Sequence, residues 1–202
     1  AEGISGFISN DASISVTFTS SESTSDFTSE NVTVTGGGTL TSFTGYGTTY
    51  TETFTPSTEG LQSIKVAANA YSDPAGNGNV NVESNTFLWT YDTTSPTITI
   101  TAAEGSSGFI SNDASLSLTF TLSESTSDFT DADVTVTGGG KLTSFTGSGT
   151  TYTATLTPSI EGLQSINVAA NAYSVPAGYG NVNVDSNTFL RTYPFSYPHL
   201  NH

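Results

Sequence analysis

The side chains of this sequence that could do chemistry are mostly carboxylates. Acidic positions recur at a fixed spacing, among them Asp11 and Asp113, Glu22 and Glu124, Asp26 and Asp128, and Glu59 and Glu161. Two carboxylates facing each other across a cleft could hydrolyse a glycoside. These acids lie instead in Ser- and Gly-rich stretches that predict turns and loops, without the clustered aromatic residues that a sugar cleft needs.

Nucleophilic catalysis has no candidate residues within the main part of the chain. The sequence contains no Cys, and its only histidines are His199 and His202, close to the last residue. A serine nucleophile needs a base such as histidine to activate it. The sequence therefore predicts a protein that is not an enzyme.

The charge balance excludes another class of function. The formal net charge is −15, and the only basic side chains are Lys65, Lys141 and Arg191. A nucleic-acid partner needs a basic face, which this chain cannot form. The acidic, Cys-free composition and the absence of a long apolar run favour an extracellular or cell-surface protein without a membrane span. Because Ala1 is not an initiator residue, we expect a mature or excised fragment.

The sequence is an internal duplication. Aligning residues 1–91 with residues 103–193 needs no gap and gives 74 identities in 91 positions. Each copy is long enough to form its own core. We therefore predict a first domain at 1–91, a linker at 92–96, a second domain at 97–193 and a tail at 194–202.

Two-residue alternation predicts β-strands throughout, and no stretch has a helical period. Ile14, Val16 and Phe18 share one face of a strand at 12–19, and Gly45-Tyr46-Gly47 predicts a turn. Short strands separated by Gly- and Pro-containing turns favour an all-β fold, two tandem antiparallel β-sandwich domains of about seven strands each.

Two differences between the copies carry interpretations of their own. Glu52 corresponds to Ala154, and we interpret it as an edge position of its strand. Trp89 corresponds to Arg191. Because a buried Trp could not be exchanged for Arg at small cost, we expect this side chain at the rim or outside the core.

Five short motifs carry a family resemblance. They are Thr17-Phe18-Thr19-Ser20-Ser21-Glu22, Val32-Thr33-Val34-Thr35-Gly36-Gly37, Gly47-Thr48-Thr49-Tyr50, Asp73-Pro74-Ala75-Gly76-Asn77 and Tyr91-Asp92-Thr93-Thr94-Ser95-Pro96-Thr97. In this order they resemble the bacterial Ig-like tandem repeats of biofilm-associated and giant repeat adhesins. The resemblance implies Ig-like β-sandwiches, a structural role in an extracellular fibre or adhesin stalk, and Ca²⁺ at the junctions between domains.

A calcium site is predicted at the linker. In an Ig-like sandwich the entering strand starts at the same end as two of the loops, so Asp92 should approach Glu124 and Asp128. Carboxylates crowded together repel each other unless a cation bridges them. The alternative is that they are solvated loop acids. The second copy has Val175, Tyr179 and Pro194 where the first has Asp73, Asn77 and Asp92, which argues against a repeated site there.

Two further binding hypotheses involve carbohydrate. Asn31-Val32-Thr33 is a glycosylation acceptor pattern, and Ser and Thr make up 67 of 202 residues. These residues indicate either a glycosylated surface or solvated outer faces of strands. A carbohydrate-binding module that uses exposed Tyr46, Trp89 and Tyr179 is the alternative to a stalk.

The tail predicts head-to-tail assembly of identical subunits. The second domain has an opening strand at 97–101, whereas the first begins just after the corresponding point, which predicts an open apolar groove. In the repeat register Pro198, Leu200 and His202 align with Pro96, Ile98 and Ile100. We expect this tail either to fill the groove of the next molecule or to be a disordered end.

Overall fold

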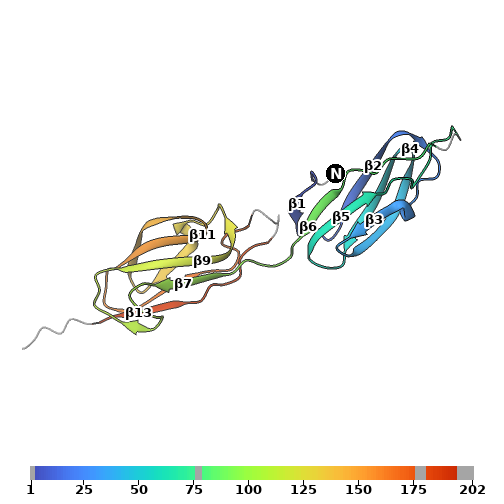
Figure 1. The fold of residues 1–202 in the computed structure, drawn as a ribbon. Coiled ribbons are helices and arrows are strands. Elements are labelled where there is room, and N and C mark those ends of the chain that lie inside the picture. The colour runs from blue at the N-terminus through green and yellow to red at the C-terminus, as the bar shows by residue number, and fades with distance from the viewer. Residues whose placement is uncertain (1–2, 76–78, 176–180, 195–202) are drawn as a thin grey trace, which may run out of the picture. The chain divides into compact units, whose positions relative to one another are not determined.

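The computed structural model describes residues 3–75, 79–175 and 181–194, and it divides into unit 1, Ala1–Thr93, and unit 2, Thr94–His202 (Figure 1). The regular secondary structure of both units is almost entirely β-strand, which confirms the predicted pair of Ig-like β-sandwiches. Across the described residues the only helices are short 3-10 turns, and none has the length or apolar character to span a bilayer.

Unit 1 has two sheets. One has the order β1-β6-β5-β3 and the other pairs β2 with β4. The elements of this unit are β1 (Phe7–Ser9), β2 (Ile14–Thr24), η1 (Ser29–Asn31), β3 (Val32–Thr35), β4 (Gly38–Pro56), β5 (Gly60–Val66) and β6 (Phe87–Tyr91). All pairs are antiparallel except β1 and β6, which run parallel.

Unit 2 repeats this arrangement with one additional strand. Its sheets have the orders β10-β12-β13-β8 and β11-β9-β7, so that β7 extends the second sheet (Figure 1). The elements are β7 (Ile98–Ala102), β8 (Phe109–Ile110), β9 (Leu116–Thr126), η2 (Asp131–Asp133), β10 (Val134–Thr137), β11 (Gly140–Pro158), β12 (Gly162–Val168) and β13 (Phe189–Tyr193).

The strands bury the faces that the alternation predicts. In β2, Ile14 and Val16 are buried while Ser15 and Thr17 are exposed, and β5 buries Gln62, Ile64 and Val66. The predicted turn at 45–47 is confirmed, although it lies inside the element β4. The chain reverses there, since a Cβ on Gly38 would lie 2.6 Å from the Thr55 carbonyl oxygen and the rings of Phe43 and Tyr50 stack. Gly45 and Gly47 have φ angles of 128° and 69°, which glycine adopts at low cost.

The cores of the two units differ in continuity. In unit 2 a single buried cluster includes Ile98 and Ile100 from β7 together with Phe120 and Phe129. In unit 1 the buried residues form two clusters, one around Trp89 and one around Phe27. The strand that unites the core of unit 2 has no counterpart among the described residues of unit 1.

Candidate functional site

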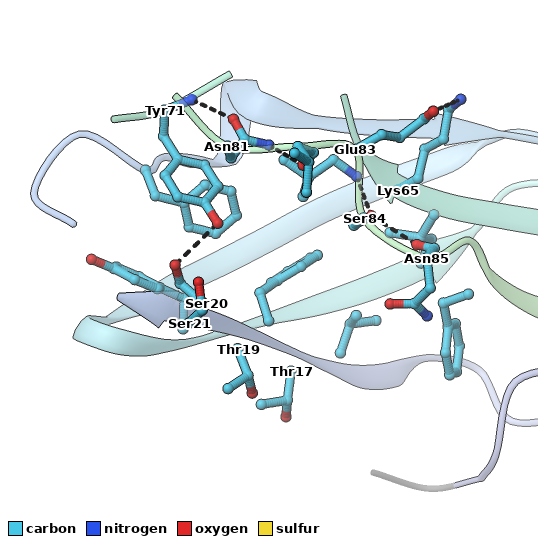
Figure 2. A pocket seen from close by; sticks show the side chains of 18 of the residues that line it. Thr17, Thr19, Ser20, Ser21, Lys65, Tyr71, Asn81, Glu83, Ser84 and Asn85 are labelled. Atoms are coloured by element: carbon cyan, nitrogen blue, oxygen red, sulfur yellow. Dashed lines mark hydrogen bonds and ion pairs between the residues drawn. The ribbon is translucent and has the colours of Figure 1, made fainter. Parts of the chain in front are cut away.

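A groove with a volume of about 490 Å³ runs along β2 in unit 1 (Figure 2). One wall is β2 from Ser15 to Ser21, and the other is the segment Asn81–Asn85 that leads into β6. The apolar part of the lining includes Phe18, Phe27, Tyr50, Ile64, Val66 and Phe87. The groove thus combines an apolar interior with the free edge of a strand.

A single asparagine holds the wall opposite β2 in place. The side-chain oxygen of Asn81 accepts hydrogen bonds from the backbone N–H groups of Ala70 and Tyr71, at 2.7 and 3.0 Å. Its side-chain nitrogen donates to the carbonyls of Ala67 and Val82, both at 2.8 Å. Four hydrogen bonds from one amide give this irregular segment a fixed path without a strand ladder.

Several other polar side chains of the groove wall are paired (Figure 2). The Tyr71 hydroxyl donates to Ser20 Oγ at 3.1 Å, across the end of the groove. The Ser84 hydroxyl accepts from the N–H of Val66 and donates to the Asn85 carbonyl. Lys65 and Glu83 form an exposed ion pair of 2.5 Å, which contributes little to stability because solvent screens it.

In both units an aspartate fastens a loop to the end of a strand, and we call this arrangement a carboxylate clamp. In unit 1 it lies beside the groove. Asp26 accepts hydrogen bonds from the Ser72 hydroxyl at 2.7 Å, from the Thr24 hydroxyl at 2.6 Å and from the Ser72 N–H at 3.1 Å. These bonds lower the pKa of Asp26 to about 2. An acid with several donors of its own and a lowered pKa serves the fold, since it fastens the Ser72 loop to the end of β2.

Comparison with known proteins identifies the fold family. The family model described as bacterial Ig-like domain matches residues 6–88 and again residues 92–191. The chain belongs to this family of bacterial Ig-like domains. A search of the curated proteins finds no match. Ig-like domains of this family are typically non-catalytic and are often found in surface proteins.

The predicted calcium ligands belong to different Ig-like units. Asp92 follows β6 in unit 1, where its N–H donates to the Ser9 carbonyl at 3.1 Å. Glu124 and Asp128 belong to unit 2. Over the described residues of the chain, no three His, Cys, Asp or Glu side chains gather as a metal-binding group. Calcium binding at the linker stays a prediction.

The two predicted ligands of unit 2, Glu124 and Asp128, lie near Tyr173. Burial raises the pKa of Tyr173 to about 12, and the charges of Glu124 and Asp128 add to the effect. Partial burial acts to raise the pKa of Asp128, but hydrogen bonds from Thr126 and Ser174 outweigh it and leave that pKa lowered. Asp128 therefore repeats the clamp of Asp26, which is a structural role for one of the predicted ligands.

The predicted glycosylation residue also has a structural role. The Asn31 side-chain nitrogen donates to the Ala70 carbonyl at 2.8 Å, and its oxygen accepts from the Thr28 N–H at 2.6 Å. Asp133 makes the same cap to Thr130 in unit 2. A glycan at Asn31 would replace one of the two hydrogens on that nitrogen, so the bond to Ala70 would have to come from the other.

The expectation that Trp89 lies outside the core is wrong. Its side chain is fully buried, stacks on Phe7 with ring centroids 6.0 Å apart, and donates to Ser9 Oγ at 3.1 Å. Of the aromatic residues proposed for sugar binding, Tyr46 is 90% exposed and Tyr179 lies outside the described residues. Trp89 is therefore not available as a sugar-stacking platform on the folded unit.

The edge interpretation of Glu52 is wrong as well. Glu52 is 2% exposed, and its neighbour across the ladder in β2 is Val16. The Ser29 hydroxyl donates to Oε1, while Oε2 is buried without a partner over the described residues. Burial raises the pKa of this carboxyl, and the bond from Ser29 only partly opposes the effect.

Sequence reasoning missed the asparagines that shape the groove. Asn81 and Asn85 lie in a segment whose counterpart differs only by Asp185 in place of Glu83. The available signal was that this polar loop is nearly identical in the two copies, because loops that only contact solvent tolerate sequence change. The tail residues Pro198, Leu200 and His202 lie outside the described residues, and their predicted role in polymerisation stays a prediction.

Proposed function

We propose that the chain is a non-catalytic structural module of an extracellular bacterial fibre or adhesin stalk. The observation that carries the proposal is that one Ig-like unit follows another along the chain with nearly the same sequence. Units repeated in series extend a surface protein without new chemistry. Exposed Thr and Ser on the outer faces of the strands keep such a module hydrated.

Two measurements on the full chain test the stalk. Force spectroscopy should give two unfolding events, each releasing about 30 nm of chain for roughly 90 residues. A glycan array should give no saturable binding, because a spacer has no ligand site of its own. Saturable binding to one glycan class would replace the stalk with the carbohydrate-binding alternative.

Calcium and glycans belong to this proposal as additions. A Ca²⁺ held by Asp92, Glu124 and Asp128 would stiffen the connection between two units, and small-angle scattering curves that are identical with Ca²⁺ and with chelator would exclude it. Glycans on Asn31 or on the Thr-rich faces would protect an exposed stalk. A native mass equal to the 20.9 kDa polypeptide would exclude them.

Head-to-tail assembly is the polymeric form of the proposal. The tail aligns Pro198, Leu200 and His202 with the opening strand of unit 2, so it could add to a second molecule as a donor strand. Such a contact is heterologous and extends as a filament instead of closing. Deleting residues 194–202 should abolish concentration-dependent assembly, and fibres that persist without the tail would contradict this form.

A further inference from the structure

Unit 2 shows what kind of segment fits along the groove of unit 1. In unit 2, β7 pairs antiparallel with β9, from Ile98 opposite Leu122 to Ala102 opposite Leu118. Ile98 and Ile100 point into the core and are 4% and 1% exposed. In the repeat register the same track in unit 1 is the edge of β2 from Val16 to Ser20, which lines the groove.

The backbone groups on that edge are arranged for a further strand. In unit 2 the Ser123 N–H donates to the Thr97 carbonyl at 2.9 Å, at one end of the ladder. Hydrogen-bonded pairs alternate along an antiparallel ladder, so Thr119 and Thr121 also direct their N–H groups at β7. Thr17 and Thr19 are their counterparts in unit 1, and the backbone N–H groups of both are directed at the groove. Over the described residues, β2 pairs only with β4.

The opposite wall presents the same contacts in both units. In unit 2 the Asn187 side chain accepts from the Ile100 N–H at 2.7 Å and donates to the Ile100 carbonyl at 3.0 Å. The Val184 N–H donates to the Pro96 carbonyl, and the Tyr173 hydroxyl donates to the Thr97 carbonyl. Unit 1 has the same residue types at these places, namely Asn85, Val82 and Tyr71.

In the described part of unit 1 the contacts of Asn85 and Val82 are unused, whereas the Tyr71 hydroxyl donates to Ser20 Oγ instead. Asn85 is exposed beside the groove (Figure 2), and over the described residues its side chain makes no hydrogen bond. Val82 is 84% exposed, compared with 45% for Val184. Phe18 is only partly buried and touches both core clusters, whereas its counterpart Phe120 is fully buried. Apolar surface and backbone donors are therefore uncovered along the same line.

We propose that this groove is a binding site for an extended segment of the Pro96–Ala102 type, a proline followed by alternating β-branched apolar residues. The segment runs antiparallel to β2, with its two isoleucine positions directed between the clusters of Trp89 and Phe27. Backbone pairing supplies part of the affinity, and the isoleucine pockets supply specificity. This site belongs to the edge of unit 1, and it does not depend on the stalk role.

The chemistry of the site favours this segment over the tail of the chain. In the repeat register His202 takes the position of Ile100, the more deeply buried of the two isoleucines. Placing an imidazole there without a partner is costly. Opposite the Ile98 position, unit 1 has Ser20 where unit 2 has Leu122. This exchange removes a large side chain, so the groove accepts residues larger than isoleucine at this position.

The test titrates a synthetic peptide with the sequence of residues 94–103 into the full chain. We expect saturable 1:1 binding by calorimetry and slower amide hydrogen exchange at Thr17 and Thr19. The matched amides of Thr119 and Thr121, already paired with β7, serve as the internal control and should not change. A peptide with serine at both isoleucine positions should bind about 100-fold more weakly or worse, since burial of the two side chains is lost.

A protein variant distinguishes binding of the peptide in the groove from non-specific binding. Asn85→Ala should leave the thermal midpoint of the free chain unchanged and weaken the peptide about tenfold, because two hydrogen bonds to it are lost. The proposal is overturned if the peptide of residues 94–103 does not bind, or if the serine peptide binds equally well. It is also overturned if a peptide of residues 194–202 binds more tightly.

Discussion

At the scale of single residues, Trp89 and Arg191 show how one buried position holds two opposite chemistries. Trp89 packs edge-on against Phe54 at 5.9 Å and satisfies its N–H on Ser9. Arg191 is equally buried, donates to the carbonyls of Ser111 and Asp113, and lies over the Tyr193 ring at 5.1 Å. The guanidinium is tolerated because backbone carbonyls and an aromatic face receive part of its charge.

Arg191→Trp should stabilise unit 2. Over the described residues, Nε and Nη1 of Arg191 and the Ser111 hydroxyl are buried without partners. An indole would remove the two unpaired nitrogens and could donate to Ser111, as Trp89 does to Ser9. We expect the free energy of unfolding to rise by about 1–4 kcal/mol, measured by calorimetry.

The reverse exchange in unit 1 is the matched control. Trp89→Arg should destabilise unit 1, because Ser9 and the ring of Phe7 lose the partner that they have now. If Arg191→Trp lowered the stability of unit 2, the cost of fitting the indole beside Leu156 would exceed the gain. The interpretation that the unpaired nitrogens of Arg191 destabilise unit 2 would then be wrong.

These residues also show where sequence reasoning failed. The exchange of Trp for Arg suggested an exposed position, because burying a charged side chain in an apolar core is costly. That reasoning takes no account of the hydrogen-bond acceptors that lie near the guanidinium in the structure. Exchange of Glu for Ala at position 52 suggested a strand edge for the same reason. A pattern of substitution reports what a site tolerates, and tolerance depends on hydrogen-bond partners that only the packed structure reveals.

At the scale of elements, one cross-strand pair has been exchanged as a unit. In unit 1, Val16 of β2 lies opposite Glu52 of β4. In unit 2, Leu118 of β9 lies opposite Ala154 of β11, and both are buried. The larger leucine accompanies the smaller alanine, so the volume of the pair is partly preserved while the carboxylate is lost.

The double substitution Val16→Leu and Glu52→Ala should stabilise unit 1 by about 1–3 kcal/mol at pH 7, because a buried carboxylate oxygen without a partner disappears. Burial raises the pKa of Glu52 above its ordinary 4.5. Its contribution to stability is therefore fully present below about pH 4.5 and is lost as pH rises through the raised value. The gain from the variant should grow from pH 4.5 to pH 7.

Single substitutions and pH provide the controls for this pair. Glu52→Ala alone leaves a cavity and Val16→Leu alone crowds the carboxylate, so the two effects should not add. Chemical denaturation curves at both pH values measure each variant. A gain that is equal at pH 4.5 and pH 7 would show that the carboxylate of Glu52 is not the cause.

Strand positions were largely predictable from the sequence, whereas strand partners were not. Alternation identified which residues of β2 face inward, because side chains on a strand point to opposite faces in turn. It could not show that β1 and β8 pair in parallel, since these strands have only three and two residues. It also could not locate the groove-lining asparagines, because loop hydrogen bonds have no period.

At the scale of the whole molecule, the two units show how much one strand contributes to the stability of an Ig-like unit. They share most of their sequence, yet unit 2 buries Ile98 and Ile100 and forms one continuous core, while unit 1 has two clusters and an open groove. Burying each isoleucine contributes about 1.5–3 kcal/mol. Because each unit has its own core, the difference should appear as a difference in stability between them.

We expect two thermal transitions by calorimetry, with unit 1 unfolding first. Trp89 is the only tryptophan and is buried in unit 1, so its fluorescence should follow the lower transition alone. Ile100→Ala should destabilise unit 2 by about 2–5 kcal/mol, which brings the upper transition down toward the lower one and leaves the fluorescence midpoint in place. If the fluorescence followed the upper transition instead, β7 would not be the element that distinguishes the two units in stability.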